Sequence, residues 1–427
     1  MMKIYRYEDV PLEELLIRTM EQSGVQDAVS AIIADVAARG DDALFEYARR
    51  FDGAELSALE VSREEIDAAY DAVDPEFRAV LERAAENIRA YHRHELQEPF
   101  QFQKEDGTIL GMKITPIENV GLCIPGRTAA YPSSVLMTAI PAKIAGCRQL
   151  VMISPPGPHG KHPDAILAAA KIAGVDRVFR MGGAQGVAAL AYGTQTVPRV
   201  DKIVGPGSAY VAEAKRQVFG RVDIDMIAGP SEILVIADGT CNPAFVAADL
   251  LSQAEHDVLS SAVLVTDSEA LALAVQNEVE RQLSLLPRED IARASIETNG
   301  KIILTPDLDT AMDTANALAP EHLEICTDDP MSWLPKVQNA GSVFLGKYCP
   351  ESLGDYLSGP NHTLPTCGAA RFSSPLSVDD FIKKTQYSCF TPRALEAVSE
   401  DIALFARKEG LEAHARAALI RFEKEAD

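Results

Sequence analysis

The sequence predicts an α/β protein with two domains of similar construction, each a largely parallel sheet covered by helices. Two observations support this prediction. From about residue 110 onward, short runs rich in Val and Ile alternate with Ala-rich helical segments, which is typical of parallel sheets. Before and after that region, apolar residues recur three and four positions apart, which indicates helices.

The N-terminal part is expected to be helical, with little strand character before about residue 110. Its helices are predicted at residues 28–38, 41–51, 64–73 and 75–96. Pro75 suits the first position of the last helix, because the N–H group that proline lacks has no helical partner there.

Strand–helix units make up the middle of the chain. Strands are expected at residues 120–124, 150–154, 177–181, 202–204, 232–237, 262–266, 301–305 and 342–345. Between the first strands we expect one helix that ends at residue 142, and further helices at residues 164–173 and 209–218.

The last part of the chain changes character twice. Residues 349–375 are rich in turn-forming residues, and an irregular segment of that length is usually functional. From residue 378 onward the chain is expected to be helical, most clearly at residues 394–407 and 411–425.

Charge and composition disfavour several classes of function. The formal net charge is −23, from 63 acidic and 40 basic residues, so the surface repels nucleic acid and anionic membranes. No apolar run reaches the ~18 residues of a transmembrane helix, and the first residues lack the apolar core of a signal peptide. We therefore expect a cytoplasmic protein that binds neither nucleic acid nor membrane.

The seven cysteines are scattered and form no Cys-x-x-Cys pair. An odd, dispersed set fits reduced thiols better than a disulfide framework or a cysteine zinc site. Any bound metal must therefore use histidine and oxygen ligands.

Two glycine turns follow predicted strands, at residues 182–186 and 205–208. Ligands of open α/β sheets bind beyond the carboxyl ends of strands, where glycines allow close approach and helix N-termini favour anions. Neither turn has the Gly-x-Gly-x-x-Gly pattern, so an ordinary tight turn is the favoured alternative for each. If a nucleotide binds at these turns, its site therefore differs from the usual glycine-rich dinucleotide site.

Two segments combine histidine with a second polar group. Gln253 and His256 lie three residues apart at a helix end, so they share one face and could ligate a metal. The alternative is a solvated helix end, with His256 near the negative end of the helix dipole. Glu321 and His322 are adjacent and could act as two bases in one site, or they could form a polar turn between a helix and a strand.

Two further segments supply similar groups. Asp355 and His362 lie in the irregular segment and offer oxygen and nitrogen donors, although an ordinary solvated loop is the alternative. Glu409 and His414 lie in the C-terminal helical region, where a histidine is usually a surface residue. Taken together, these nitrogen and oxygen donors suit Zn²⁺, with Mn²⁺ or Co²⁺ as substitutes.

The chain resembles histidinol dehydrogenases over nearly its whole length. The resemblance rests on long motifs in the right order, at residues 120–137, 182–190, 200–214, 227–237, 249–256, 319–324 and 354–366. It implies two incomplete Rossmann-like domains with helical N- and C-terminal extensions. The implied boundaries are an extension of residues 1–22, a first domain of residues 23–122 and 233–376, a nucleotide-side domain of residues 123–232, and a tail of residues 377–427.

The resemblance also implies the activity. Family members use NAD and one zinc ion per subunit to oxidise L-histidinol to L-histidine through a bound aldehyde, in the last steps of histidine biosynthesis. They are homodimers, and each active site borrows the C-terminal region of its partner.

The resemblance assigns roles to particular residues of this chain. Glu321 and His322 match the catalytic bases, and Gln185 matches a residue that contacts NAD. Ser231, His362 and Glu409 match substrate contacts, and the metal ligands and His322 contact the substrate as well. The metal ligands match Gln253, His256, Asp355 and His414, and by this analogy Glu409 and His414 act in the partner's site.

Three residues depart from the family pattern on the predicted cofactor side, namely Cys123, Arg127 and Ser208. They replace a usual Tyr, Gly and Asn. They motivate one alternative, a related zinc- and NAD-dependent dehydrogenase of another polar alcohol such as a sulfonated diol. A zinc hydrolase and a non-enzymatic metal-binding protein are less favoured alternatives.

Overall fold

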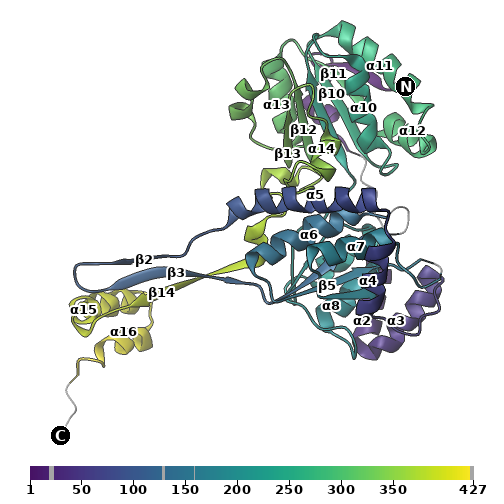
Figure 1. Cartoon of the computed structure of the whole chain (residues 1–427). Helices are drawn as coiled ribbons and strands as arrows, with labels where there is room; N and C mark the ends of the chain where they lie inside the picture. The colour runs from purple at the N-terminus through teal and green to yellow at the C-terminus, as the bar shows by residue number, and fades with distance from the viewer. Residues whose placement is uncertain (19–23, 127–129, 158, 424–427) are drawn as a thin grey trace. The chain divides into compact units, whose positions relative to one another are not determined.

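The computed structural model describes residues 1–18, 24–126, 130–157 and 159–423, which divide into two compact units (Figure 1). The first unit comprises Met1–Leu96 and Ile117–Phe381, and the second comprises Gln97–Pro116 and Ile382–Asp427. Arg127 lies outside the described residues. Among the helices of the described ranges, none is long and apolar enough to cross a lipid bilayer.

The first unit contains a five-stranded sheet whose paired strands all run parallel, in the order β6-β5-β4-β7-β8. The side chains of the central strands are buried, which explains why these segments are continuous apolar runs. The predicted strand–helix alternation is confirmed here. The strands are β4 (Asn119–Cys123), β5 (Gln149–Ser154), β6 (Arg177–Arg180), β7 (Lys202–Val204) and β8 (Asp223–Ile224), and the helices are α6 (Pro132–Ala145), α7 (Asp164–Ala173), α8 (Gly183–Tyr192) and α9 (Ala209–Val218).

The predicted N-terminal helices form and pack against the helices of this sheet. The helix α2 contacts α8 and α9, α4 contacts α7, and α5 contacts α6. Pro75 occupies the first turn of α5, where Asp74 caps the helix by accepting a hydrogen bond from the N–H of Phe77. The elements are α2 (Gln26–Arg39), α3 (Asp41–Tyr47), a π-helix (Ala48–Asp52), α4 (Arg63–Ala72), α5 (Pro75–His92) and a 3₁₀ turn (Arg93–Glu95). The domain boundaries given above stay a prediction.

A six-stranded parallel sheet forms the other part of the first unit, in the order β1-β11-β10-β9-β12-β13. The strands are β1 (Lys3–Arg6), β9 (Glu232–Ala237), β10 (Ser261–Thr266), β11 (Lys301–Leu304), β12 (His322–Cys326) and β13 (Ser342–Leu345). The helices are α1 (Leu12–Leu15), α10 (Pro243–Ala254), α11 (Glu269–Leu283), α12 (Glu289–Thr298), α13 (Leu308–Leu318) and α14 (Glu351–Tyr356), with 3₁₀ turns at Pro330–Ser332, Leu334–Lys336, Ala369–Arg371 and Val378–Phe381.

Two strands of this sheet were not predicted. The expectation of little strand structure before about residue 110 is wrong for β1, which pairs with β11 from much later in the sequence, and for the strand Phe100–Gln103 of the second unit. The strand β12 carries His322 and Glu324 among its residues, so its sequence lacks the apolar run that marks a buried strand. Both strands form because backbone hydrogen bonds to distant partners complete the sheet.

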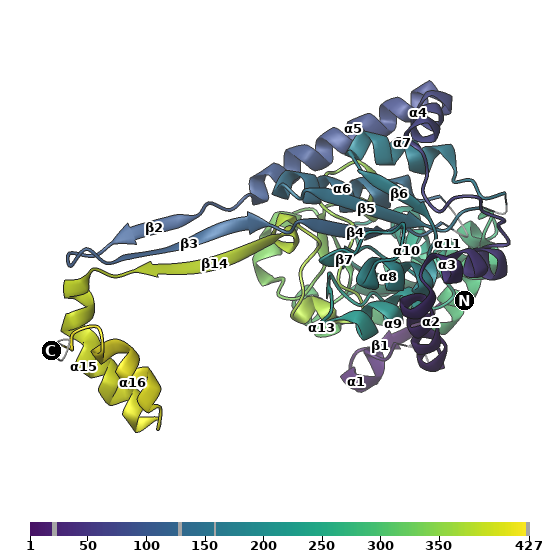
Figure 2. The same cartoon turned by 90° about the horizontal axis from the view of Figure 1, so that it is seen from below.

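The second unit is an antiparallel ribbon with two helices (Figure 2). Its strands are β2 (Phe100–Gln103), β3 (Ile109–Pro116) and β14 (Ile382–Cys389), and its helices are α15 (Pro392–Lys408) and α16 (Glu412–Leu419). The expectation of a helical chain from residue 378 onward is wrong for β14, which pairs with β3 from Ile382↔Pro116 to Cys389↔Ile109. Most of its side chains are exposed, so no alternation of apolar and polar residues marks it in the sequence.

Candidate active site

Glu321 and His322 lie at the start of β12, in the interior of the six-stranded sheet. The helix α13 ends at Leu318, and Ala319 follows in a left-handed conformation with a φ of 51°. Because a residue with a Cβ rarely adopts that conformation, the surrounding structure must hold the turn. The turn delivers Glu321 and His322 to the beginning of the strand, where both are buried.

The main chain of Glu232, the first residue of β9, orients the imidazole of His322. Nδ1 of His322 lies 2.8 Å from the carbonyl oxygen of Glu232, which can only accept a hydrogen bond. Nδ1 therefore carries a proton, and Nε2 of the neutral ring is the basic nitrogen. Burial lowers the pKa of His322 to about 4, so the ring is neutral near pH 7.

The carboxyl group of Glu321 is held by the same residue. The backbone N–H of Glu232 donates to Oε2 of Glu321 across 2.8 Å, and this oxygen is 3.6 Å from Nδ1 of His322. Burial raises the pKa of Glu321 well above its usual range, and the hydrogen bond from Glu232 offsets only part of that rise. The two neighbouring side chains are thus a carboxyl group with raised pKa and an imidazole with lowered pKa, which is typical of an acid–base site.

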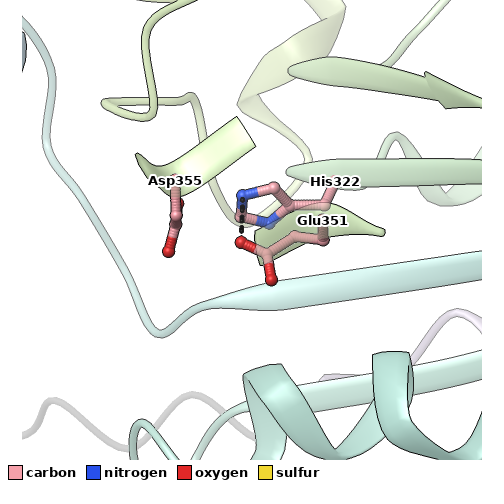
Figure 3. Close-up of side chains that lie close together, drawn as sticks. All are labelled: His322, Glu351 and Asp355. Carbon is pink, nitrogen blue, oxygen red and sulfur yellow. Dashed lines mark ion pairs between the residues drawn. The ribbon is translucent and has the colours of Figure 1, made fainter. Parts of the chain in front are cut away.

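The helix α14 adds two carboxyl groups to the site. Ligand atoms of His322, Glu351 and Asp355 lie within 4.8 Å of one another (Figure 3). Nε2 of His322 is 3.7 Å from Oε1 of Glu351, which is buried without a hydrogen-bond partner among the described residues. A buried imidazole and two carboxylates at this spacing could hold a divalent cation.

Glu351 and Asp355 differ in the protonation that their surroundings favour. Burial and the nearby charge of Asp355 raise the pKa of Glu351 to about 8. Burial also tends to raise the pKa of Asp355. The hydrogen bond and charge of His362, together with the charges of His322 and His256, outweigh burial and lower this pKa to about 2. Asp355 is therefore the ionised carboxylate of the cluster at neutral pH.

The end of α10 brings the predicted metal ligands Gln253 and His256 to the same cluster. The side chain of Gln253 is buried next to the carboxyl group of Glu351, whose pKa it lowers in part. His256 follows the helix, and its charge lowers the pKa of Asp355. Three of the four predicted ligands thus gather beside the two predicted bases.

His362 and Ser231, the predicted substrate contacts in this unit, lie around the same cluster. Nδ1 of His362 is 3.5 Å from Oδ1 of Asp355, and its Nε2 is 3.3 Å from Oγ of Ser134 in α6. Ser231 directly precedes Glu232, and its carbonyl oxygen accepts a hydrogen bond from the N–H of Ser261.

The predicted cofactor-side residues lie on the five-stranded sheet. Gln185 is buried in the first turn of α8, two residues after the Gly182–Gly183 step that follows β6. Cys123 is the buried last residue of β4, and Ser208 is the residue at which α9 begins. All seven cysteines, Cys123 included, are free in the structure.

Glu409 and His414 belong to the second unit, whereas the cluster around His322 lies within the first. Glu409 follows α15 and His414 lies in α16, and both side chains are exposed.

Four functional candidates were missed in the sequence. Glu351 precedes Asp355 by four residues, and this spacing on a helix is the one signal that could have found it. Glu232 acts mainly through its backbone, which no sequence pattern reveals. Asp249 and Glu324 influence each other's pKa, and Oε1 of Glu324 accepts a hydrogen bond from the N–H of Glu351 across 2.7 Å.

These observations define a class of protein. The chain is an α/β protein with a buried carboxyl–imidazole pair beside nitrogen and oxygen donors, and with glycine turns at the carboxyl ends of strands. Such an arrangement is typical of enzymes with acid–base chemistry next to groups that could hold a cation.

Comparisons with known proteins sharpen this class. The family model described as histidinol dehydrogenase matches residues 17–422. Histidinol dehydrogenase of Geobacillus kaustophilus is 55% identical over 412 residues, which cover 96% of this chain and 97% of that protein. The corresponding protein of Listeria monocytogenes is 52% identical over 416 residues, which cover 97% of each chain.

A solved structure agrees with these relatives. The crystal structure of histidinol dehydrogenase from Elizabethkingia anophelis matches with a TM-score of 0.94 and 38% sequence identity, over 98% of each chain. The chain therefore belongs to the histidinol dehydrogenase family and is an oxidoreductase. The resemblance seen in the sequence is confirmed, and a dehydrogenase of a different polar alcohol is not favoured.

Proposed function

We propose that this chain oxidises L-histidinol to L-histidine with two molecules of NAD, in the last steps of histidine biosynthesis in the cytoplasm. The observation that carries the proposal is the geometry of His322, whose Nδ1 is bound to the carbonyl of Glu232 while Nε2 faces the cluster of Glu351 and Asp355. A neutral imidazole fixed in this tautomer is the base that alcohol oxidation needs.

The residues present fit a zinc ion. Gln253, His256 and Asp355 would hold it, and a second copy of the chain would supply His414. Oε1 of Glu351 is buried without a hydrogen-bond partner among the described residues, and the raised pKa values of Glu321 and Glu351 report crowded buried carboxyl groups. A cation would offset that crowding. Zinc, when bound, would hold the amino alcohol and polarise its oxygen.

Protons move in both steps. In the first, Nε2 of His322 takes the hydroxyl proton, and the hydride leaves the carbinol carbon for NAD, which gives the aldehyde. In the second, Glu321 would help water add to the aldehyde, and His322, after releasing its first proton to solvent, would take a hydroxyl proton of the hydrate. Bound NAD would supply the hydride acceptor for each oxidation. The sum consumes one alcohol, one water and two NAD⁺, and yields one carboxylate, two NADH and three protons.

NAD would bind at the carboxyl ends of the five-stranded sheet. Gln185 and the turn that begins at Gly205 lie there, at the starts of α8 and α9, where helix N-termini favour phosphate. The buried thiol of Cys123 stays protonated near the turn, because burial raises its pKa to about 12.

A homodimer with shared sites completes the proposal. Glu409 and His414 are exposed on the second unit, and the cluster in the first unit contains three of the four proposed ligands. Each copy would therefore complete the site of the other.

The stoichiometry of NADH formation tests the proposed reaction. We expect two NADH for each L-histidinol consumed, measured by absorbance, with L-histidine as the product. The variant His322→Asn, which keeps a hydrogen-bonding side chain but loses the base, is the control. One NADH per substrate with free aldehyde as the product would overturn the four-electron reaction.

A further inference from the structure

A single residue, Glu232, orients both proposed bases through its backbone. Its N–H donates to Oε2 of Glu321 across 2.8 Å, and its carbonyl oxygen accepts from Nδ1 of His322 across 2.8 Å. Glu232 is the first residue of β9, and its N–H serves a side chain of the site instead of a neighbouring strand. Its N–H and C=O groups belong to the peptide units on either side of the Glu232 Cα, so a shift of this residue would displace the partners of both Glu321 and His322.

The side chain of Glu232 is anchored by Arg18 from the N-terminal segment. Oε1 of Glu232 lies 2.7 Å from Nε of Arg18, and the two side chains are 4% and 15% exposed. Because a buried charge is strongly unfavourable without a partner, this pair fixes where the Glu232 side chain can lie.

Arg18 also reaches the segment that leads into the bases. Its Nη2 donates to the carbonyl oxygen of Leu318 across 2.6 Å. Leu318 is the last residue of α13, directly before the left-handed Ala319 and the turn into Glu321. One guanidinium group therefore ties the start of β9 to the end of α13, which are the two segments that hold the bases.

We propose that Arg18 and Glu232 are positioning residues, which act as a clamp that keeps Glu321 and His322 in register and holds His322 in its Nδ1-protonated form. This inference rests on the proposed role of Glu321 and His322 as bases. The clamp itself contacts no reacting atom and acts through the backbone N–H and C=O of Glu232 and through the turn after α13.

The first test removes the guanidinium. In Arg18→Met we expect kcat with L-histidinol to fall by about 10²-fold, because a small displacement of catalytic groups costs about that much in rate. The KM for NAD should change little. Arg18→Lys should recover part of kcat. Arg18 is partly exposed, so added guanidinium ion should restore activity to Arg18→Met, whereas methylammonium should do so less well.

A matched control separates positioning from general stability. Arg177 forms a more exposed ion pair with Glu60 on the five-stranded sheet, with 2.6 Å between Nη2 and Oε2 and a second hydrogen bond from Nε to Oε1. Arg177→Met should lower the melting temperature about as much as Arg18→Met and leave kcat nearly unchanged. Equal losses of kcat in the two variants would overturn the clamp.

The second test does not depend on turnover. With histidines labelled with ¹⁵N, the imidazole signals report the tautomer, and His322→Asn identifies the signal of His322. We expect a single Nδ1-protonated form in the unaltered chain and a mixture of tautomers in Arg18→Met. An unchanged tautomer in Arg18→Met would overturn the proposal, whether or not L-histidinol is the substrate. If His322 has a single tautomer in the unaltered chain and a mixture in Arg18→Met, but the unaltered chain makes no NADH from L-histidinol, the clamp stands and the proposed function is refuted.

Discussion

The two parallel sheets of the first unit place their candidate site residues at opposite ends of their strands. On the five-stranded sheet, Gln185 and the Gly205 turn follow the carboxyl ends of β6 and β7. On the six-stranded sheet, Glu232 and His322 are the first residues of β9 and β12. The same kind of sheet therefore offers two different sites.

The difference has a physical origin. At the carboxyl ends, glycine turns and helix N-termini expose N–H groups that suit the phosphates of a nucleotide. At the amino ends of β9 and β12, the backbone groups of Glu232 lie inside the protein and bind the side chains of Glu321 and His322. In the proposed function, one sheet edge would receive the nucleotide and the other would orient the two bases.

The largest expected effect comes from the amino-end site. His322→Asn should lower kcat by roughly 10²–10⁴-fold, because the variant has no basic nitrogen at the position of Nε2. Zinc content, measured by atomic absorption, should stay unchanged. Near-normal turnover would show that His322 is not the base. It would also contradict the proposed difference in function between the two sheets.

Glu321→Gln should have a smaller and more selective effect. Hydration of the aldehyde needs the second base, so oxidation of added histidinaldehyde should fall by about 10²-fold and oxidation of the alcohol by less. The two half-reactions can be measured separately by NADH formation from each substrate. An equal loss in both would argue against a role specific to the second step.

His414→Asn tests whether the second unit completes the amino-end site. Removing a residue that only hydrogen-bonds to a metal ligand already lowers metal affinity by about 10-fold or more. Loss of one of the four ligands themselves should therefore weaken zinc binding by at least that factor. The measurement is zinc retained during titration with a chelator. His159→Asn, a change at another histidine outside the proposed ligand set, is the control, and full zinc retention in His414→Asn would exclude it as a ligand.

The smallest effect concerns the carboxyl-end site. Gly205 has a φ of +109°, and a Cβ there would collide with the carbonyl group of Cys123. Gly205→Ala should cost about 1–3 kcal/mol of unfolding free energy and raise KM for NAD more than KM for L-histidinol. Gly220→Ala is the matched control, since Gly220 has a φ of +94° and nothing within 4 Å of an added Cβ. Equal effects of both changes on KM for NAD would show that the Gly205 turn is not part of the nucleotide site.

Local patterns in the sequence determined much of the fold. The strands β4, β5, β7 and β9 and the helices α7 and α9 follow from apolar runs and helical periodicity, because each pattern reflects burial of one segment against a sheet. The adjacent pair Glu321–His322 and the spacing of Gln253 and His256 pointed to the site for the same local reason.

Contacts between distant segments decided the rest. The strands β1 and β14 depend on partners far away in the sequence, and neither carries an apolar pattern that marks it. The proposed roles of Glu351, Glu232 and Arg18 depend on contacts that bring α14 and β9 to β12 and the N-terminal segment to β9. The sequence alone established the family, the helices and strands with clear periodicity, and the residue types that could serve as bases or ligands, because these are local features of short segments. The tautomer of His322, the protonation of the carboxyl groups and the convergence of the ligands were decided by tertiary structure, because burial and hydrogen bonding depend on neighbours that the sequence does not place side by side.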